Sequence, residues 1–215
     1  MSELATRWSQ NDKVLFIGDS ITDCGRRSCP QGLGSGYVSL INNVVTIAAP
    51  QLNIEIVNRG ISGNTSRDLV RRWESDVIAE APDWLYIMIG INDVWRQLEN
   101  RHEEAVLVDE FEENYRTMLE TTLEKLPNCR IRPMEATVHG EDLTSEGNAL
   151  LAPYLEVIHR LADKYGLTVV PTNQVFRQSI QTRPSLKLTT DGVHPNAYGH
   201  ALLALTILGT SGLTV

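Results

Sequence analysis

The chain has 215 residues, of which 42% are hydrophobic and 21% are charged. This composition is typical of a folded protein, and the length suits a single hydrophobic core, so we predict one domain over residues 1–215. Nineteen basic and 27 acidic residues give a net charge of −8. Because that charge repels phosphate groups, it disfavours nucleic acid and anionic membrane surfaces as partners.

Residues 1–13 are polar and contain no apolar leader segment, which favours a cytoplasmic location. The three cysteines, Cys24, Cys29 and Cys129, are odd in number, so we expect reduced thiols. Cys24 and Cys29 have no histidine nearby in the sequence to complete a tetrahedral site. We therefore expect neither a metal nor another cofactor.

Strands and helices are expected to alternate along the chain. A short β-branched and aromatic run at 14–17 predicts a buried strand that ends in a turn carrying Ser20. A loop over 23–36 precedes a helix over 37–49, which Pro50 closes, and a second strand over 54–57 runs into Gly60. Asn64 or Thr65 can cap the next helix, which extends to about residue 77.

The second half of the chain continues this order. Residues 84–89 are almost all apolar, as expected for a strand covered on both faces. Helical periodicity follows over 108–126 and 146–165, with strands expected at about 130–136 and 167–170, and Pro195 is expected to begin a last helix through 208. This order predicts an α/β fold with a central five-stranded parallel sheet, whose carboxyl edge carries the functional residues.

The fourth of these strands departs from the usual apolar pattern. It contains two arginines and Pro133, and because proline cannot donate to a strand ladder, pairing should end or bulge there. Glu135 either contacts a substrate or forms a surface ion pair. Residues 139–147 are polar, and we expect a mobile loop.

Three residues have the chemistry of a nucleophilic catalytic triad. A serine hydroxyl needs a base within hydrogen-bond reach and a carboxylate that holds this base in the correct tautomer. Ser20 follows the first strand, and His194 lies three residues after Asp191, so one turn can present both side chains. Taken singly, Ser20 could instead cap a helix, and His194 could be a hydrogen-bonded structural residue.

The same edge offers donors for the negative oxygen that forms when serine attacks a carbonyl. Gly63 allows close approach of its backbone N–H, Asn92 can direct a side-chain amide, and the Ser20 backbone N–H supplies a third donor. The alternative is structural, because Gly63 could serve only a strand-to-helix turn and Asn92 only an Asx-turn.

Four sequence blocks carry a resemblance to a known family. They read IGDSITD at 17–23, NRGISGNT at 58–65, IGINDVW at 89–95 and DGVHPN at 191–196. In this order the chain resembles the SGNH/GDSL hydrolase superfamily, whose four named residues fall on Ser20, Gly63, Asn92 and His194, with Asp191 as the triad acid. The resemblance implies a flavodoxin-like three-layer α/β/α sandwich and metal-independent ester hydrolysis through an acyl-serine intermediate.

Within this superfamily the chain is similar to the bacterial acetylxylan-esterase-like branch, which deacetylates sugars. We predict that Asp19 and Trp95 contact the substrate, because an aromatic ring at a pocket rim can stack on a sugar. Trp95 could equally pack in the core or under a lid.

The leading hypothesis is a serine esterase that removes short acyl groups, acetyl above all, from carbohydrates, with a small-molecule ester as its partner and with homo-oligomers possible. A lysophospholipase or thioesterase for longer acyl chains is the first alternative. A non-catalytic carbohydrate-binding module is the second, and a complete acid–base set argues against it.

Overall fold

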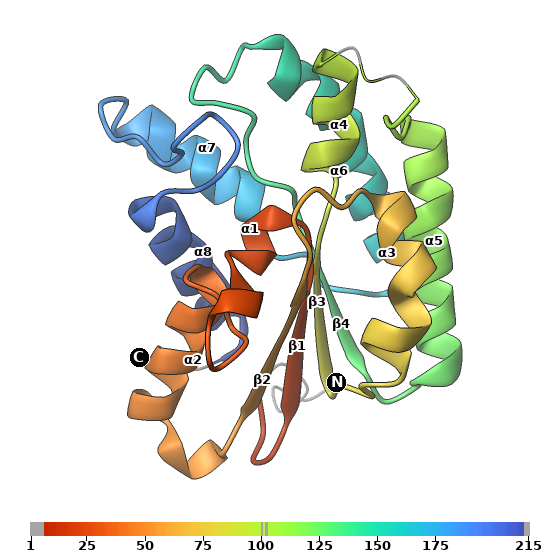
Figure 1. Cartoon of the computed structure of the whole chain (residues 1–215), viewed down its shortest axis with the longest axis vertical. Coiled ribbons are helices and arrows are strands. Elements are labelled where there is room, and N and C mark those ends of the chain that lie inside the picture. The colour runs from red at the N-terminus through yellow and green to blue at the C-terminus, as the bar shows by residue number, and fades with distance from the viewer. Residues whose placement is uncertain (1–6, 100, 102, 213–215) are drawn as a thin grey trace.

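A parallel sheet of four strands lies between helices on both of its faces (Figure 1). The computed structural model describes residues 7–99, 101 and 103–212. The strands lie in the order β2-β1-β3-β4, with β1 at Lys13–Gly18, β2 at Glu55–Gly60, β3 at Trp84–Met88 and β4 at Arg130–Met134. The predicted α/β class with a parallel sheet is therefore confirmed.

The helices follow the strands in the expected alternation. They are α1 (Ser20–Asp23), η2 (Arg26–Ser28), α2 (Tyr37–Ala48), η3 (Pro50–Leu52), α3 (Ser66–Trp73), the π-helical η4 (Glu74–Ile78), α4 (Ile91–Leu98), α5 (Val108–Lys125), α6 (Glu146–Tyr165), α7 (Thr172–Thr182) and α8 (Ala197–Thr210). Helices α2 and α8 pack together on one face of the sheet, whereas α3 and α5 pack together on the other (Figure 1). None of the described helices is long and apolar enough to cross a membrane.

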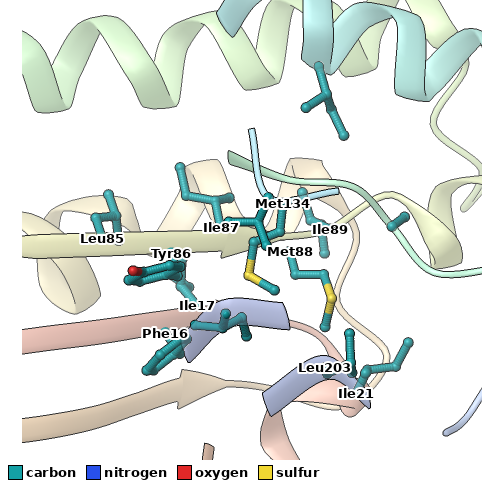
Figure 2. Close-up of a cluster of buried hydrophobic side chains, with 14 of the residues drawn as sticks. Phe16, Ile17, Ile21, Leu85, Tyr86, Ile87, Met88, Ile89, Met134 and Leu203 are labelled. Carbon is teal, nitrogen blue, oxygen red and sulfur yellow. The ribbon is translucent and has the colours of Figure 1, made fainter. Parts of the chain in front are cut away.

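The centre of the molecule is formed by β1 and β3, whose side chains alternate between the two faces of the sheet. Figure 2 shows Leu85 and Tyr86 projecting to opposite sides of β3. Tyr86 stacks on Phe16 of β1, with 4.9 Å between the ring centroids. Near the carboxyl ends of these strands, Leu203 of α8 lies beside Ile21 of α1 (Figure 2). Burial of these side chains fixes the strand ends on which the site is built.

The prediction of five strands is wrong, because residues 167–170 contribute only an isolated bridge between Val170 and Met134. The Val170 N–H donates to the Pro133 carbonyl at 2.8 Å, and the Glu135 N–H donates to the Val170 carbonyl at 3.2 Å. Pro171 follows without an N–H and α7 begins at the next residue, so pairing stops there. The bridge nevertheless occupies the fifth place of the 2-1-3-4-5 order of flavodoxin-like sheets.

The unusual residues of β4 have physical explanations. Pro133 pairs with Ile87 of β3 in register, and its carbonyl points to the Val170 side. Its nitrogen faces the same side, so no bond to β3 is lost and the strand ends one residue later without a bulge. Arg130 and Arg132 place their guanidinium groups 5.2 and 5.0 Å from the centre of the buried Trp84 ring, within the range of cation–π attraction.

Several element boundaries differ from expectation. The helix expected from Pro195 begins at Ala197, because the Asn196 side chain accepts hydrogen bonds from the N–H groups of Tyr198 and Gly199 and forms the N-cap. Helices α4 and α7 were not predicted as separate elements. Both are amphipathic, and their buried residues include Val94 in α4 and Phe176 in α7.

Candidate active site

Ser20 lies at the carboxyl end of β1, where the chain turns directly into α1. The Asp19 carboxylate caps this short helix by accepting a hydrogen bond from the Ile21 N–H at 2.9 Å. Burial raises the pKa of Asp19 to about 6, against the lowering effect of this hydrogen bond and of His194. Asp19 is 1% exposed, so its observed contacts are internal, and its contact with substrate stays a prediction.

The predicted triad residues are hydrogen-bonded in series. Ser20 Oγ lies 2.8 Å from His194 Nε2, and His194 Nδ1 lies 2.7 Å from Asp191 Oδ2. When Nδ1 carries the ring proton and donates it to the Asp191 carboxylate, Nε2 is free to accept the proton of Ser20. The structure therefore brings together three side chains from two distant parts of the chain in the geometry that nucleophilic catalysis requires.

Asp191 also organises the loop that carries His194. Its Oδ1 accepts hydrogen bonds from the backbone N–H groups of Val193 at 3.0 Å and His194 at 2.8 Å. Partial burial opposes ionisation, but these bonds and the His194 ring lower the pKa of Asp191 to about 2. The side chains of His194 and Asp191 are 36% and 48% exposed. The base is thus oriented by an ionised carboxylate in a site that is open to solvent.

The three predicted oxyanion donors follow the carboxyl ends of three strands: Ser20 begins α1 after β1, Gly63 lies in the turn after β2, and Asn92 lies in the first turn of α4 after β3. Gly63 has φ of +82°, a conformation that favours glycine. The Asn92 side chain is held at the start of α4, where Nδ2 donates one hydrogen to the Asn64 carbonyl at 2.9 Å and keeps a second. Within the described part of the chain, the N–H groups of Ser20 and Gly63 have no internal acceptor. Their role as oxyanion donors stays a prediction that this arrangement suits.

Trp95 lies one turn after Asn92 and packs edge-on against the imidazole of His194, with 5.9 Å between the ring centroids. The Trp95 ring also packs edge-on against His139, with 6.3 Å between the ring centroids. Asn148 holds the segment that carries His139, because its side chain accepts from the His139 N–H and donates to the carbonyls of His139 and Asp142. The expected loop is thus irregular but tied to α6.

Glu135 and Cys24 both make internal contacts with histidine side chains. Glu135 is 6% exposed and pairs with His159 at 2.7 Å, and it also accepts from the Gln174 N–H at 2.9 Å. The Glu135 carboxylate is therefore held by hydrogen bonds to His159 and to the start of α7. Cys24 is a free thiol whose Sγ lies 3.3 Å from His200 Nε2, and burial, with a smaller effect of His194, lowers the pKa of His200 to about 4.

Sequence reasoning missed the side chains that join the loops of the site. Arg72 donates to the carbonyls of Gly18 and Arg59 and to the Asn64 side chain, at 2.7–3.0 Å, and thus ties the ends of β1 and β2 together. Asp23 accepts from the Ser62 N–H and hydroxyl. No local pattern marks such residues, because their partners are backbone groups of distant segments.

Among the residues that the structure describes, no group of three or more His, Cys, Asp or Glu side chains is arranged to hold a metal ion.

Comparisons with known proteins agree with this geometry. The GDSL-like Lipase/Acylhydrolase family model matches residues 16–202. An acetylxylan esterase from Geobacillus stearothermophilus is 40% identical over 211 residues, which cover 94% of each chain. The crystal structure of that enzyme, Axe2, superimposes with a TM-score of 0.89 at 38% identity and 97% coverage of both chains. LAE5, an alpha/beta hydrolase from the metagenome of Lake Arreo in Spain, gives a TM-score of 0.88 at 31% identity, with 96% of this chain and 98% of LAE5 covered.

The family match spans most of the chain, and the Axe2 likeness extends over nearly the whole length of both proteins. Solved structures of Axe2 include catalytic mutants in which a serine, an aspartate or a histidine is replaced by alanine. The chain belongs to the GDSL-like lipase/acylhydrolase family.

Proposed function

We propose that this protein is a serine esterase that removes acetyl groups from carbohydrates, with acetylated xylooligosaccharides as the substrate class. The observation that carries the proposal is the unbroken series Ser20–His194–Asp191, with distances of 2.8 and 2.7 Å. The similarity of the chain to Axe2, an acetyl-xylooligosaccharide esterase, supports acetyl as the acyl group and a xylooligosaccharide as the sugar.

In the proposed reaction, His194 Nε2 takes the Ser20 proton as Oγ attacks the acetyl carbonyl carbon. The N–H groups of Ser20 and Gly63 and the Asn92 amide stabilise the resulting oxyanion. His194 then gives the proton to the sugar oxygen, the ester bond breaks, and an acetyl-serine remains. Water, deprotonated by His194, then attacks the acetyl carbonyl carbon, and His194 returns the proton to Ser20 Oγ as the acyl–serine bond breaks and acetate leaves. Asp191 stabilises each imidazolium that forms.

The openness of the site favours a bulky polar substrate. The half-exposed side chains of His194 and Asp191 leave room for a sugar chain that cannot enter a deep channel. Trp95 beside His194 offers an aromatic surface on which a sugar ring can stack.

The test measures acetate release from acetylated xylooligosaccharides by the parent protein and the Ser20→Ala variant. A parallel series of p-nitrophenyl esters from acetate to decanoate measures acyl preference. We expect Ser20→Ala to lose at least about 10³-fold in kcat, and the parent to prefer acetate. Parental turnover by Ser20→Ala would refute the mechanism, whereas a preference for decanoate would support the long-chain alternative.

A further inference from the structure

Helix α4 contacts the loop that carries Gly63 through three side chains. We call residues 61–66 the oxyanion loop. Asn92 donates to the Asn64 carbonyl at 2.9 Å, Asp93 accepts from the Ser66 N–H and hydroxyl at 2.6–3.2 Å, and Arg96 donates to the Gly63 carbonyl at 3.2 Å. These contacts hold the backbone at the two ends of the segment from Gly63 to Ser66.

The Asp93 contact is buried and uses both carboxylate oxygens. Asp93 and Ser66 are both 0% exposed, and Asn114 of α5 donates to the Ser66 hydroxyl at 3.1 Å. This bond therefore anchors the start of α3 to α4 inside the protein. From the opposite side, Asp23 holds the Ser62 N–H at 3.0 Å. Gly63 lies between these two anchors.

The Gly63 peptide needs a restraint of its own, because glycine has access to a wide range of backbone angles. Its carbonyl is held by Arg96 Nη2, and a Cβ added at Gly63 would lie 3.5 Å from that same atom. The guanidinium therefore covers one side of Gly63 and fixes the rotation of the peptide after it. The Arg96 side chain is 16% exposed, and its carboxylate partners Glu99 and Glu104 are 3.8 Å away. The hydrogen bond to Gly63 is thus its shortest polar contact.

We propose that Arg96 is a positioning residue for the oxyanion hole, which holds the Gly63 N–H in the direction that the developing oxyanion requires. This inference rests on the proposed function. Arg96 acts through the Gly63 carbonyl and does not contact the reacting atoms. Misplacement of one donor by about 1 Å can cost about 10²-fold in rate, so a loosened Gly63 should slow the chemical step more than it weakens substrate binding.

The test compares Arg96→Met and Arg96→Lys with Arg101→Met, a matched control that removes an exposed arginine paired with the same Glu104. For p-nitrophenyl acetate we expect Arg96→Met to lower kcat about 10- to 100-fold with KM changed less than about threefold. Arg96→Lys should recover part of this loss, since its ammonium can still donate to the Gly63 carbonyl. Arg101→Met should behave like the parent.

Two further readouts separate positioning from general damage. The Gly63 amide signal in ¹⁵N NMR spectra should broaden or split in Arg96→Met, while signals from β1 and β3 stay in place. The affinity for a boronic acid that forms a tetrahedral adduct with serine should fall by the same factor as kcat. Parental kcat in a folded Arg96→Met protein would overturn the inference.

If Arg96→Met does not fold, the same measurements on Arg96→Gln, whose shorter side chain does not reach the Gly63 carbonyl, decide, and an unaltered Gly63 signal with parental kcat there also overturns the inference. The Ser20→Ala variant separates failure of the positioning role of Arg96 from failure of the proposed function. Activity lost in Ser20→Ala but kept in Arg96→Met refutes the positioning role alone, whereas activity kept in Ser20→Ala refutes the proposed function itself.

Discussion

Replacement of Asp191 by asparagine or by alanine separates its two tasks, orientation of the base and support of the loop. In Asp191→Asn, the amide oxygen can still accept from the N–H groups of Val193 and His194, which lie 3.0 and 2.8 Å from Oδ1. The amide nitrogen then faces His194 Nδ1, where the carboxylate Oδ2 lies 2.7 Å away. Because that nitrogen donates, it forces the ring proton onto Nε2, and the ring can no longer accept the Ser20 proton.

The expected size follows from these contacts. Loss of the correct tautomer costs about 10⁴-fold in kcat, or about 5.5 kcal/mol of transition-state stabilisation. Asp191→Asn keeps the loop bonds, so its Tm should stay within about 2 °C of the parent. Asp191→Ala removes both loop bonds, each worth about 0.5–1.5 kcal/mol at most because water can replace them in this half-exposed site. Its Tm should fall by about 2–12 °C.

The assay combines p-nitrophenyl acetate kinetics with thermal unfolding followed by circular dichroism for the parent and both variants. The expected pattern is two nearly inactive proteins of which only the alanine variant is destabilised. An asparagine variant within about tenfold of parental kcat would show that the tautomer argument is wrong, and equal Tm values for the two variants would refute the loop-support argument.

Three further outcomes are expected. Asn92→Ala should lower kcat by about 10²–10³-fold with little change in KM, because one oxyanion donor is lost, and a change in KM alone would contradict that role. Trp95→Ala should raise KM for acetylated xylooligosaccharides about 2- to 10-fold while p-nitrophenyl acetate is barely affected; an equal change for both substrates, measured side by side, would argue against sugar stacking. Burial raises the pKa of Asp93 to about 7 and that of Asp19 to about 6, so the folded chain holds protons that the unfolded chain releases above about pH 4. These two carboxyl groups therefore contribute stability that is lost as pH rises from 4 to 7, whereas buried His200, whose pKa is lowered to about 4, contributes in the opposite direction. In Tm scans Asp93→Asn should lose less stability than the parent, or gain more, as pH rises from 4 to 7, and an unchanged slope would contradict the assignment.

The order of strands and helices could be predicted from the sequence because buried strands and amphipathic helices have distinct apolar periods. The fifth strand could not, since the apolar run at 167–170 does not show how far β4 extends beside it. Only Val170 overlaps β4, and Pro171 stops further pairing. Helix α7 lacks a side-chain N-cap bond, so no start signal was available.

The residues of the site also divide into those that a local sequence motif marks and those that it does not. Ser20, Asp191 and His194 could be named from local motifs, because each motif follows a strand or precedes a helix. Arg72 and Arg96 could not, because they act on carbonyl groups of Gly18 and Gly63 that are remote in the sequence. Their function depends on how loops pack against one another, and no short spacing rule encodes that packing.

The hydrogen bond between Ser20 and His194 joins residues separated by 174 positions. The serine belongs to the first strand–helix turn, and the histidine immediately precedes the final helix. A nascent chain on the ribosome therefore cannot form this contact until the segment that carries His194 has emerged and docked against the first strand–helix turn. Two complementary fragments of the chain that recover this contact must therefore have reassembled across the junction between its first and last thirds.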